Sequence, residues 1–445
     1  METSLFHRLS GAEFYGFFPE KINGFWNDTR TMRPGDCFLA LTAQRDGHEF
    51  LPDAQRKGAS CAIVNRIDRN LILPQLCVSD VLESAKTLAK IHRKDYTTVA
   101  VTGSYGKTST KDMLKLLLDE SAHATEENLN NELGITLTLS RIQSEKFGII
   151  EGGIDRPGEM DCIIDLIEPD ISITVGVTFT HVANFAKFEQ LIKEKCKILE
   201  NTLSRNKIGI VAENCLQYEP FRKLSDRFIV TGHHRNTERY PNFTRFQWLD
   251  EHKIILNGKY FNDAIFSLPE MSGGQIENFV KAATTAKILG LSDQVIGERM
   301  LQWKPGKLRG EIIKFRNREI YLDCYNANPI SMLDALQFFD QKYPGNNTYI
   351  LGGMGELGEF SDASHKIVAA YFYGKKEIII FAIGKEMWPL YDRLRSKGSN
   401  VLYCDSTKQA KEYFPRVTTG NIFIKGSWRH RLWELIEEED EVEKK

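Results

Sequence analysis

Apolar residues follow two patterns along this chain: short runs rich in Val and Ile, and longer stretches with the spacing of a helix face. Between residues 95 and 304 the two patterns alternate. The runs at 147–150 and 171–175 predict buried strands, and the apolar spacing over 188–203 predicts a helix. Such alternation is typical of an α/β fold with a doubly wound, mostly parallel sheet.

Two further α/β units flank this central stretch. Residues 1–94 carry the strand and helix patterns of a small α/β unit, and residues 305–445 follow a linker-like Pro305-Gly306 with a second open α/β pattern. We therefore predict three domains, at 1–94, 95–304 and 305–445. The stretch 205–270 is less regular, and one strand is predicted there, at 208–211.

A glycine-containing loop, Thr102-Gly-Ser-Tyr-Gly-Lys-Thr-Ser109, joins a predicted strand to a predicted helix. Backbone N–H groups and the positive end of a helix dipole make such a junction an anion site, and the Thr108 hydroxyl can ligate Mg²⁺. The first glycine is Gly103, so the loop is the shorter form of the phosphate-loop pattern. The alternative is an ordinary turn. We predict nucleotide binding by Gly103, Ser104, Gly106, Lys107, Thr108 and Ser109.

Two polar residues follow other strands of the predicted central sheet. Glu151 ends the 147–150 run, and His181 comes shortly after 171–175. Because ligands bind at the carboxyl ends of strands in open α/β sheets, both side chains could face the metal of a bound nucleotide. The alternative for each is a solvated residue at the end of a strand.

A lysine interrupts the apolar face of the helix predicted at 188–203. Lys195 stands where the stripe that includes Leu191 and Ile198 should continue. A buried lysine costs free energy unless it reaches solvent, is paired or is chemically altered. Lys195 is therefore either a snorkelling side chain or a lysine aimed into an active cleft.

Charge and composition exclude several classes of partner. The net charge is −2, so no strong field favours nucleic acid or an anionic membrane. No apolar run nears the ~18 residues of a membrane span, and the first residues lack the apolar segment of a signal peptide. The eight cysteines include no Cys-x-x-Cys pair, as expected of reduced thiols. We expect a cytoplasmic protein without nucleic-acid or membrane partners.

Motifs over the whole chain resemble those of the Mur ligases, the ATP-dependent amide-forming enzymes of peptidoglycan synthesis. The loop at 102–109 is similar to the phosphate loop of that family. Further matches are Asp28-Thr-Arg30, Asn128-Leu-Asn-Asn-Glu-Leu-Gly134, Asp323-Cys-Tyr-Asn-Ala-Asn-Pro329, Leu351-Gly-Gly-Met-Gly-Glu-Leu-Gly-Glu359 and Lys425-Gly-Ser427. The resemblance implies an N-terminal domain that binds a UDP-linked substrate, a central ATP-binding domain and a C-terminal Rossmann-like ligase domain.

Within the family, the motifs are similar to those of the member that adds D-alanyl-D-alanine to UDP-N-acetylmuramoyl-tripeptide. This implies an ADP-forming ligase: the peptide carboxylate attacks the γ-phosphate of ATP, becomes an acyl phosphate and is captured by the dipeptide amine. It also implies two Mg²⁺ ions near Thr108, Glu151, His181 and Lys195, with Lys195 carbamylated. We expect the enzyme to act on these small molecules as a monomer.

The resemblance also assigns roles residue by residue. The catalytic positions are Lys107, Glu151, His181, Lys195 and Arg309. ATP contacts beyond the phosphate loop are Asn278, Arg309, Asp323, Tyr325 and Asn326. Substrate contacts are Asp28, Thr29, Arg30, Asn130, Asn131 and Asn328.

The sequence departs from the family at the adenine and amine sides of the site. Gly274-Gln275 replaces a His-Asn pair, and Trp428 stands where arginine is common. The phosphoryl-transfer residues are unchanged. Two alternatives stay open: a Mur-type ligase for another peptide or a polyglutamate-type substrate, and a nucleotide-gated binding protein without ligase activity.

Overall fold

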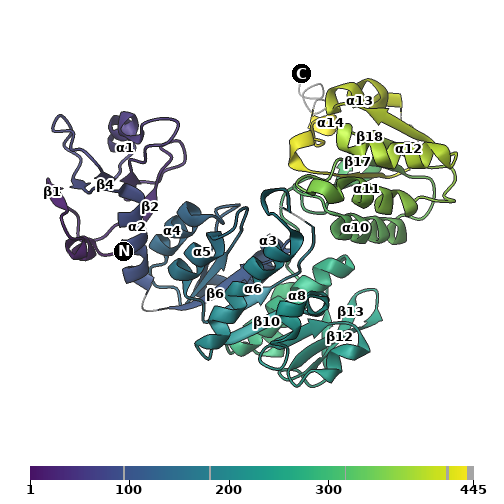
Figure 1. The fold of residues 1–445 in the computed structure, drawn as a ribbon, viewed down its shortest axis with the longest axis horizontal. Helices are drawn as coiled ribbons and strands as arrows, with labels where there is room; N and C mark the ends of the chain where they lie inside the picture. Colours follow the sequence, from purple (N-terminus) through teal and green to yellow (C-terminus); the bar gives the residue numbers. More distant parts are fainter. Residues whose placement is uncertain (94–95, 180–181, 316, 417–419, 438–445) are drawn as a thin grey trace.

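The computed structural model describes residues 1–93, 96–179, 182–315, 317–416 and 420–437. They form three lobes, each built around its own sheet, with the N-terminal and C-terminal lobes at opposite ends of the central one (Figure 1). This confirms the predicted α/β class and three-part architecture. Among the helices of these described ranges, none has the length and apolar character needed to cross a membrane.

The N-terminal lobe holds a five-stranded sheet in the order β1-β5-β4-β3-β2, in which only β1 is antiparallel to its neighbour. Its elements are β1 (Glu13–Tyr15), β2 (Phe25–Trp26), β3 (Cys37–Leu39), α1 (Leu51–Arg56), β4 (Cys61–Val64), β5 (Gln75–Cys77) and α2 (Val81–His92). The strands are short, and two of them, β3 and β4, are fully buried. These two are the strands with a clear apolar run in the sequence.

The central lobe holds a nine-stranded sheet in the order β14-β13-β12-β11-β10-β9-β6-β8-β7. Neighbours from β12 to β7 are parallel, and the hairpin strands β13 and β14 are antiparallel. Its strands are β6 (Thr97–Thr102), β7 (Ala122–Ala124), β8 (Phe147–Glu151), β9 (Ile171–Thr174), β10 (Ile208–Ala212), β11 (Ile229–Gly232), β12 (Phe243–Asp250), β13 (Lys253–Gly258) and β14 (Ala264–Ser267). Its helices are α3 (Lys107–Leu118), α4 (Glu132–Arg141), α5 (Glu159–Ile167), α6 (Phe188–Ser204), α7 (Glu219–Arg222), α8 (Gly273–Ile288) and α9 (Asp293–Met300).

The C-terminal lobe holds a six-stranded sheet in the order β15-β16-β20-β17-β18-β19, in which only β15 is antiparallel. Its elements are β15 (Glu311–Phe315), β16 (Arg318–Asp323), α10 (Pro329–Lys342), β17 (Thr348–Gly352), α11 (Ser361–Ala370), β18 (Ile379–Ile383), α12 (Trp388–Ser396), β19 (Val401–Cys404), α13 (Thr407–Tyr413), β20 (Ile422–Lys425) and α14 (Glu434–Glu437). These six strands with their intervening helices agree with the open α/β pattern expected after Pro305-Gly306.

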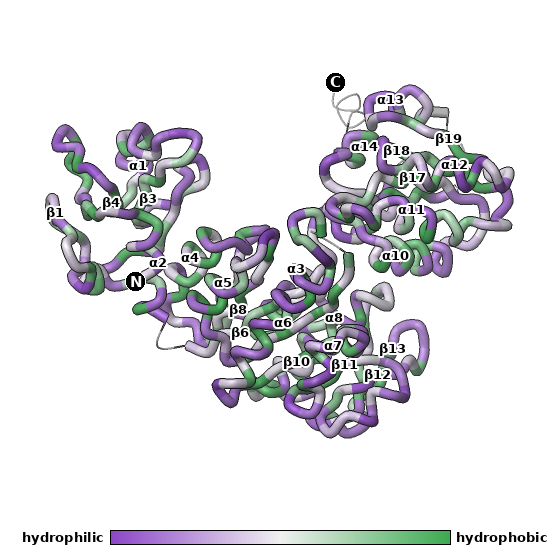
Figure 2. Tube along the Cα trace, viewed as in Figure 1, coloured by the Kyte–Doolittle hydropathy of each residue, from purple (hydrophilic) through white to green (hydrophobic). Residues whose placement is uncertain are grey.

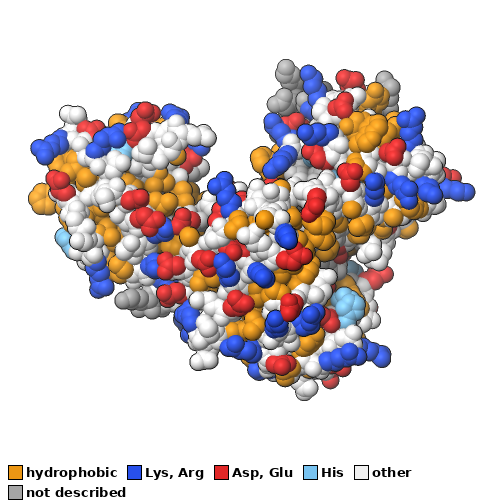
Figure 3. Space-filling model, in the orientation of Figure 1, with side chains coloured by type: hydrophobic (Ala, Val, Ile, Leu, Met, Phe, Trp, Pro, Cys, Tyr) orange, Lys and Arg blue, Asp and Glu red, His pale blue; other side chains and the backbone are white. Residues whose placement is uncertain are grey.

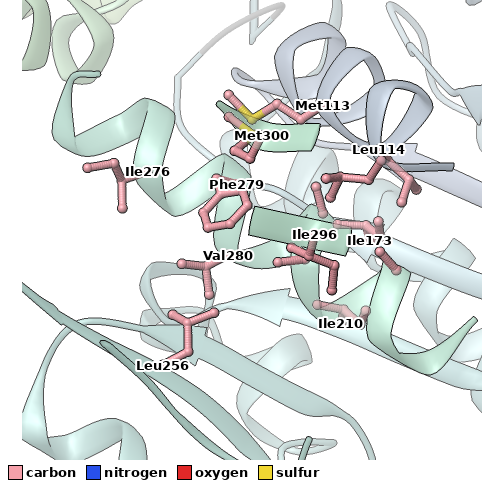
Figure 4. Packing of buried hydrophobic residues seen from close by; sticks show 14 of the residues in the cluster. Met113, Leu114, Ile173, Ile210, Leu256, Ile276, Phe279, Val280, Ile296 and Met300 are labelled. Carbon is pink, nitrogen blue, oxygen red and sulfur yellow. The ribbon is translucent and has the colours of Figure 1, made fainter. Parts of the chain in front are cut away.

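The core of the central lobe lies under the helix that follows the glycine loop. The apolar stripe of α3, which includes Met113 and Leu114, is fully buried and packs along α8 and α9. Figure 4 shows side chains of these three helices, among them Met113, Phe279 and Met300, gathered in this core. Hydrophilic segments lie mainly along the outer loops of the lobes (Figure 2). Burial of this stripe fixes the start of α3, and therefore the glycine loop, against the sheet.

The N-terminal lobe is joined to the central lobe by apolar and ionic contacts. Helix α2 packs against α4, and Leu137 of α4 belongs to the same buried cluster as Leu88 of α2. Arg141, at the end of α4, donates to the buried carboxylate of Asp36 at 2.7 Å. An ion pair buried in this way must stay closed, because either charge alone would be left without water.

The stretch 205–270 contains more structure than the sequence analysis predicted. Strands β11 to β14 lie there in addition to β10, and β12 pairs with β13 as an antiparallel hairpin. The second half of β12 is exposed, and its polar residues show no sustained alternation with apolar ones. The hairpin is held by pairing with the sheet, which a pattern search along one segment does not detect.

Candidate functional site between the central and C-terminal lobes

The loop between β6 and α3 forms a cradle that requires glycine. Gly103 has a φ of 148° and Gly106 a φ of 74°. A Cβ on Gly106 would lie 2.6 Å from Oδ1 of Asn278, so a side chain there would collide. Because α3 begins at Lys107, the N–H groups of its first turn lack partners within the helix. An anion at this position would accept hydrogen bonds from those N–H groups, and the positive end of the helix dipole would stabilise it.

A carboxylate stands directly beside this cradle. Glu151, buried at the end of β8, accepts a hydrogen bond from Oγ1 of Thr108 at 2.9 Å and another from Nδ2 of Asn130 at 2.9 Å. Gly153 N–H in turn donates to the carbonyl of Asn130 at 3.0 Å. Residues from three separate stretches of the sequence therefore meet at one point. They carry a hydroxyl, an amide and a carboxylate, whose oxygens are of the kind that bind Mg²⁺.

Two lysines converge on one backbone carbonyl of the loop. Lys107 Nζ donates to the carbonyl oxygen of Gly103 at 3.0 Å, and Lys195 Nζ donates to the same oxygen at 3.2 Å. Lys195 is 1% exposed, so it does not snorkel to solvent. Burial, together with the charge of Lys107, lowers the pKa of Lys195 to about 7. Burial also lowers the pKa of Lys107, which Glu151 opposes and Arg309 reinforces.

Most of the predicted site residues line one cavity of about 450 Å³ between the central and C-terminal lobes. Figure 3 shows a broad hollow that separates the two outer lobes. From the central lobe the cavity is lined by Ser104, Gly106, Lys107, Thr108, Ser109, Asn130, Asn131, Glu151 and Asn278. From the C-terminal lobe it is lined by Arg309, Asp323, Tyr325, Asn326 and Asn328.

The C-terminal side of this cavity presents positive charge on a fixed support. The guanidinium carbon of Arg309 lies 3.7 Å from the ring centroid of Tyr325, a cation–π contact. Lys425 is buried, forms an ion pair with Asp323 and donates to the carbonyl of Asn326 at 3.2 Å. These pairs hold the side chains in place before any ligand arrives.

Other predicted residues have different positions. Asp28 and Arg30 form an ion pair at 2.6 Å in the N-terminal lobe, and with Thr29 they lie outside the residues that line this cavity. Lys195 lies behind the loop, also outside the lining. Asn131 and Asn328 line the cavity, but each also caps a helix with its side chain, α4 and α10 respectively. His181 lies outside the described residues.

Several residues to which the sequence analysis gave no role also line the cavity, among them Tyr105, Ser272, Ile330, Asp334, Glu356 and Lys425. Gln275 and Trp428, which stand at the departures from the family, line it as well. Lys425 had a signal in the sequence, the Lys425-Gly-Ser427 motif. Asp334 had no such signal in the sequence, because a polar residue in a helix does not show which other lobe its side chain contacts.

Comparison with known families matches two parts of the chain. Residues 101–286 match the Mur ligase middle domain, and residues 308–427 match the Mur ligase, glutamate ligase domain. The first part carries the glycine loop, Glu151 and Lys195. The second carries Asp323, Tyr325 and the other C-terminal lining residues except Trp428.

Comparisons over the full chain agree. UDP-N-acetylmuramoyl-tripeptide--D-alanyl-D-alanine ligase of Rickettsia prowazekii is 28% identical and covers 92% of this chain and 93% of that protein. The same-named enzyme of Escherichia coli is 30% identical, with 77% of each chain covered. MurF from Acinetobacter baumannii has the same fold, with a TM-score of 0.82, 22% identity and coverage of 100% of this chain and 99% of that chain. A MurF ligase from Thermotoga maritima in complex with ADP has a TM-score of 0.74 and 25% identity, and covers 94% and 98%. The chain belongs to the Mur ligase family.

Proposed function

We propose that this chain is the ligase that joins D-alanyl-D-alanine to UDP-N-acetylmuramoyl-tripeptide at the expense of ATP. The single observation that carries the proposal is the inter-lobe cavity, in which the phosphate cradle and the Thr108–Glu151 pair face Arg309. The name of the relatives in Rickettsia and Escherichia coli supports the choice of substrates. The ADP complex of the Thermotoga relative supports the choice of nucleotide.

The residues of the cradle fit a nucleotide triphosphate with Mg²⁺. Glycine at 106 lets the loop pass close to Asn278 and Val175 with a positive φ and brings the chain directly into the first turn of α3, whose N–H groups could bind phosphate oxygens. Within the described residues no group of three or more His, Cys, Asp or Glu side chains is placed to hold a metal. Mg²⁺ commonly takes one or two protein oxygens and completes its shell with phosphate and water, so Thr108 and Glu151 would suffice. When bound, the ion would neutralise charge on the phosphate oxygens.

The chain itself must bring two anions together, the peptide carboxylate and the triphosphate. Lys107 on the central side and Arg309 on the C-terminal side supply positive charge from opposite walls of the cavity. Positioning and charge neutralisation are most of what phosphoryl transfer requires. Approach of the two walls would also exclude water from the activated acyl group, which water would otherwise hydrolyse.

Lys195 fits a carbamate. An amine whose pKa is about 7 is neutral in a substantial fraction of molecules near neutral pH, and only the neutral amine attacks carbon dioxide. The N–C bond forms, one proton leaves to solvent, and the product is an anion on a long stem. Carbamylation would thus replace a second cationic group beside Lys107 at the Gly103 carbonyl with an anion. It would also provide oxygen ligands for a second Mg²⁺ near the phosphates.

We assign the UDP end of the substrate to residues 1–94, ATP binding to 95–304 and the dipeptide side to 305–445. Asp28, Thr29 and Arg30 would contact the uridine nucleotide. Arg33 of the same lobe pairs with Glu126 at 3.5 Å, next to the Asn-rich segment that carries Asn130. A substrate lying along this path would place its peptide end at the cavity.

A coupled assay of phosphate release tests the proposed reaction. With ATP and Mg²⁺, release should require both UDP-N-acetylmuramoyl-tripeptide and D-alanyl-D-alanine. Lys107→Ala should lower kcat by about 10²–10³-fold because it removes one charge that stabilises the transferring phosphate. Lys115→Ala, on the same helix with its amine on the Asp119 carbonyl, is the matched control. Release with another acceptor and none with this dipeptide would favour the wider class of Mur-type ligases instead.

Substitution of Lys195 tests the carbamate. Lys195→Ala should reduce kcat by roughly 10²-fold or more, and formate or acetate should restore part of the rate by replacing the missing carboxylate. Lys193→Ala, an exposed residue on the same helix, should leave the rate unchanged. Normal ATP binding with no loss of any function in Lys195→Ala would instead indicate a nucleotide-gated binding protein.

The low pKa of Lys195 has a consequence for stability that needs no substrate. In buffer free of carbon dioxide, the folded chain binds fewer protons at Lys195 than the unfolded chain between pH about 7 and the ordinary lysine pKa of 10.5. Stability therefore rises with pH across this window as the cost of a buried charge disappears. Urea unfolding should show Lys195→Met to be more stable than the wild type at pH about 6.5, with the gap closing by pH about 9.5. A gap independent of pH would contradict the shifted pKa.

A further inference from the structure

An aspartate of the C-terminal lobe reaches across to the start of a helix in the central lobe. Asp334, on α10, accepts a hydrogen bond from Oγ of Ser272 at 2.6 Å and another from the N–H of Gly274 at 2.9 Å. Ser272 caps α8, and Gly274 lies in its first turn. The carboxylate therefore occupies the positive end of the α8 dipole, with one hydrogen bond to each of its oxygens.

The first turn of α8 has the shape that this contact needs. A Cβ on Gly274 would lie 2.8 Å from Oδ2 of Asp334 and 3.2 Å from its Cγ, too close for a real side chain. Gly274 has an ordinary helical φ, so the backbone does not require glycine there. In this arrangement of the lobes, the lack of a side chain at 274 allows the carboxylate of Asp334 to reach the start of α8.

The contact joins the two halves of the proposed active site. Beyond Gly274, the next turn of α8 carries Asn278, which lies beside Gly106 of the phosphate cradle. On the other side, α10 directly follows the segment with Asp323 and Tyr325. Asp334 itself lies between the nucleotide cavity and a second cavity of about 880 Å³, and lines both. We infer that Asp334 is a positioning residue, which sets the orientation of the C-terminal lobe over the phosphate cradle.

A second contact explains why one carboxylate could control orientation. Phe360, which precedes α11, stacks on Phe179 of the central lobe with ring centroids 4.2 Å apart. An apolar contact of this kind holds two surfaces together but directs them weakly, because it is not directional. With the chain crossing between the lobes at 304–310, Phe360 would form a pivot. The two hydrogen bonds of Asp334 near the middle of α10 fix the rotation about it, and the Lys342–Glu270 ion pair at the end of the same helix supports them.

The contact is also suited to opening. Removal from water raises the pKa of Asp334, and the hydrogen bonds from Ser272 and Gly274 oppose that shift. The cost of taking the carboxylate out of water thus offsets much of what its hydrogen bonds provide. A lobe held in this way can dock in one orientation and still separate to release product.

Small-angle X-ray scattering of the full chain without substrates tests the docking directly. Asp334→Ala should enlarge the radius of gyration relative to the wild type, because the C-terminal lobe samples more orientations. Gly274→Ala should do the same, since its methyl displaces the carboxylate while favouring the helix itself. Gln337→Ala, an exposed position one turn along α10, is the matched control and should match the wild type. Superimposable profiles for all four proteins would overturn the proposal.

Kinetics then separate positioning from folding. Only this kinetic part of the inference rests on the proposed function, because the scattering test needs no activity. Asp334→Ala should lower kcat by about 10²-fold, as expected for misplaced reacting groups, and change the KM for ATP by no more than a few-fold, because the cradle is intact. The double variant Gly274→Ala/Asp334→Ala should be no worse than either single one, since both break the same contact.

Additive losses, or a loss confined to KM, would overturn the role of Asp334. An unchanged melting temperature shows that the lobes themselves stay folded. A wild-type chain that releases no phosphate would reject the proposed function, and the scattering comparison would still decide whether Asp334 docks the lobe.

Discussion

Concentration of positive charge around the glycine loop is the constraint on which the site depends. Lys107 and Lys195 both reach the carbonyl of Gly103, and Arg309 approaches from the facing lobe. Charges of one sign held this closely, out of water, are costly unless an anion joins them or one of them is lost. Under the proposed function a triphosphate would supply the anion, and a neutral or carbamylated Lys195 would remove one charge. The first turn of α3 adds N–H groups that point the same way.

The remainder of the fold holds these groups in place. The buried stripe of α3 anchors the cradle to the sheet, and β8 brings Glu151 beside Thr108. The C-terminal lobe fixes its own contributors through Lys425 and Tyr325 before it meets the cradle. The relation between the lobes, by our inference, depends on contacts such as the hydrogen bonds of Asp334, the stacking of Phe360 on Phe179 and the Lys342–Glu270 ion pair. A ligase that must admit three substrates and then exclude water needs this division between rigid parts and a movable joint.

The sequence predicted best what is local. A strand, a glycine turn and a helix that follow one another closely in the sequence define the cradle. The break in the apolar stripe of its helix marks Lys195 as unusual from the sequence alone. The resemblance to the Mur ligases named Glu151 and Arg309, and the fold places both at the cavity. Contacts between distant segments left no such pattern. The β12–β13 hairpin is held by strand pairing. The docking of Asp334 depends on the lack of a side chain at Gly274, and in a sequence this glycine cannot be told from one that only provides flexibility. His181 stays a prediction.

A crystal structure with a non-hydrolysable ATP analogue and Mg²⁺ tests the central claim most directly. The account predicts phosphates against the first turn of α3, a metal between Thr108 and Glu151, and additional density on the amine of Lys195. An analogue bound elsewhere, with the Thr108–Glu151 hydrogen bond intact and no metal beside it, would contradict the account.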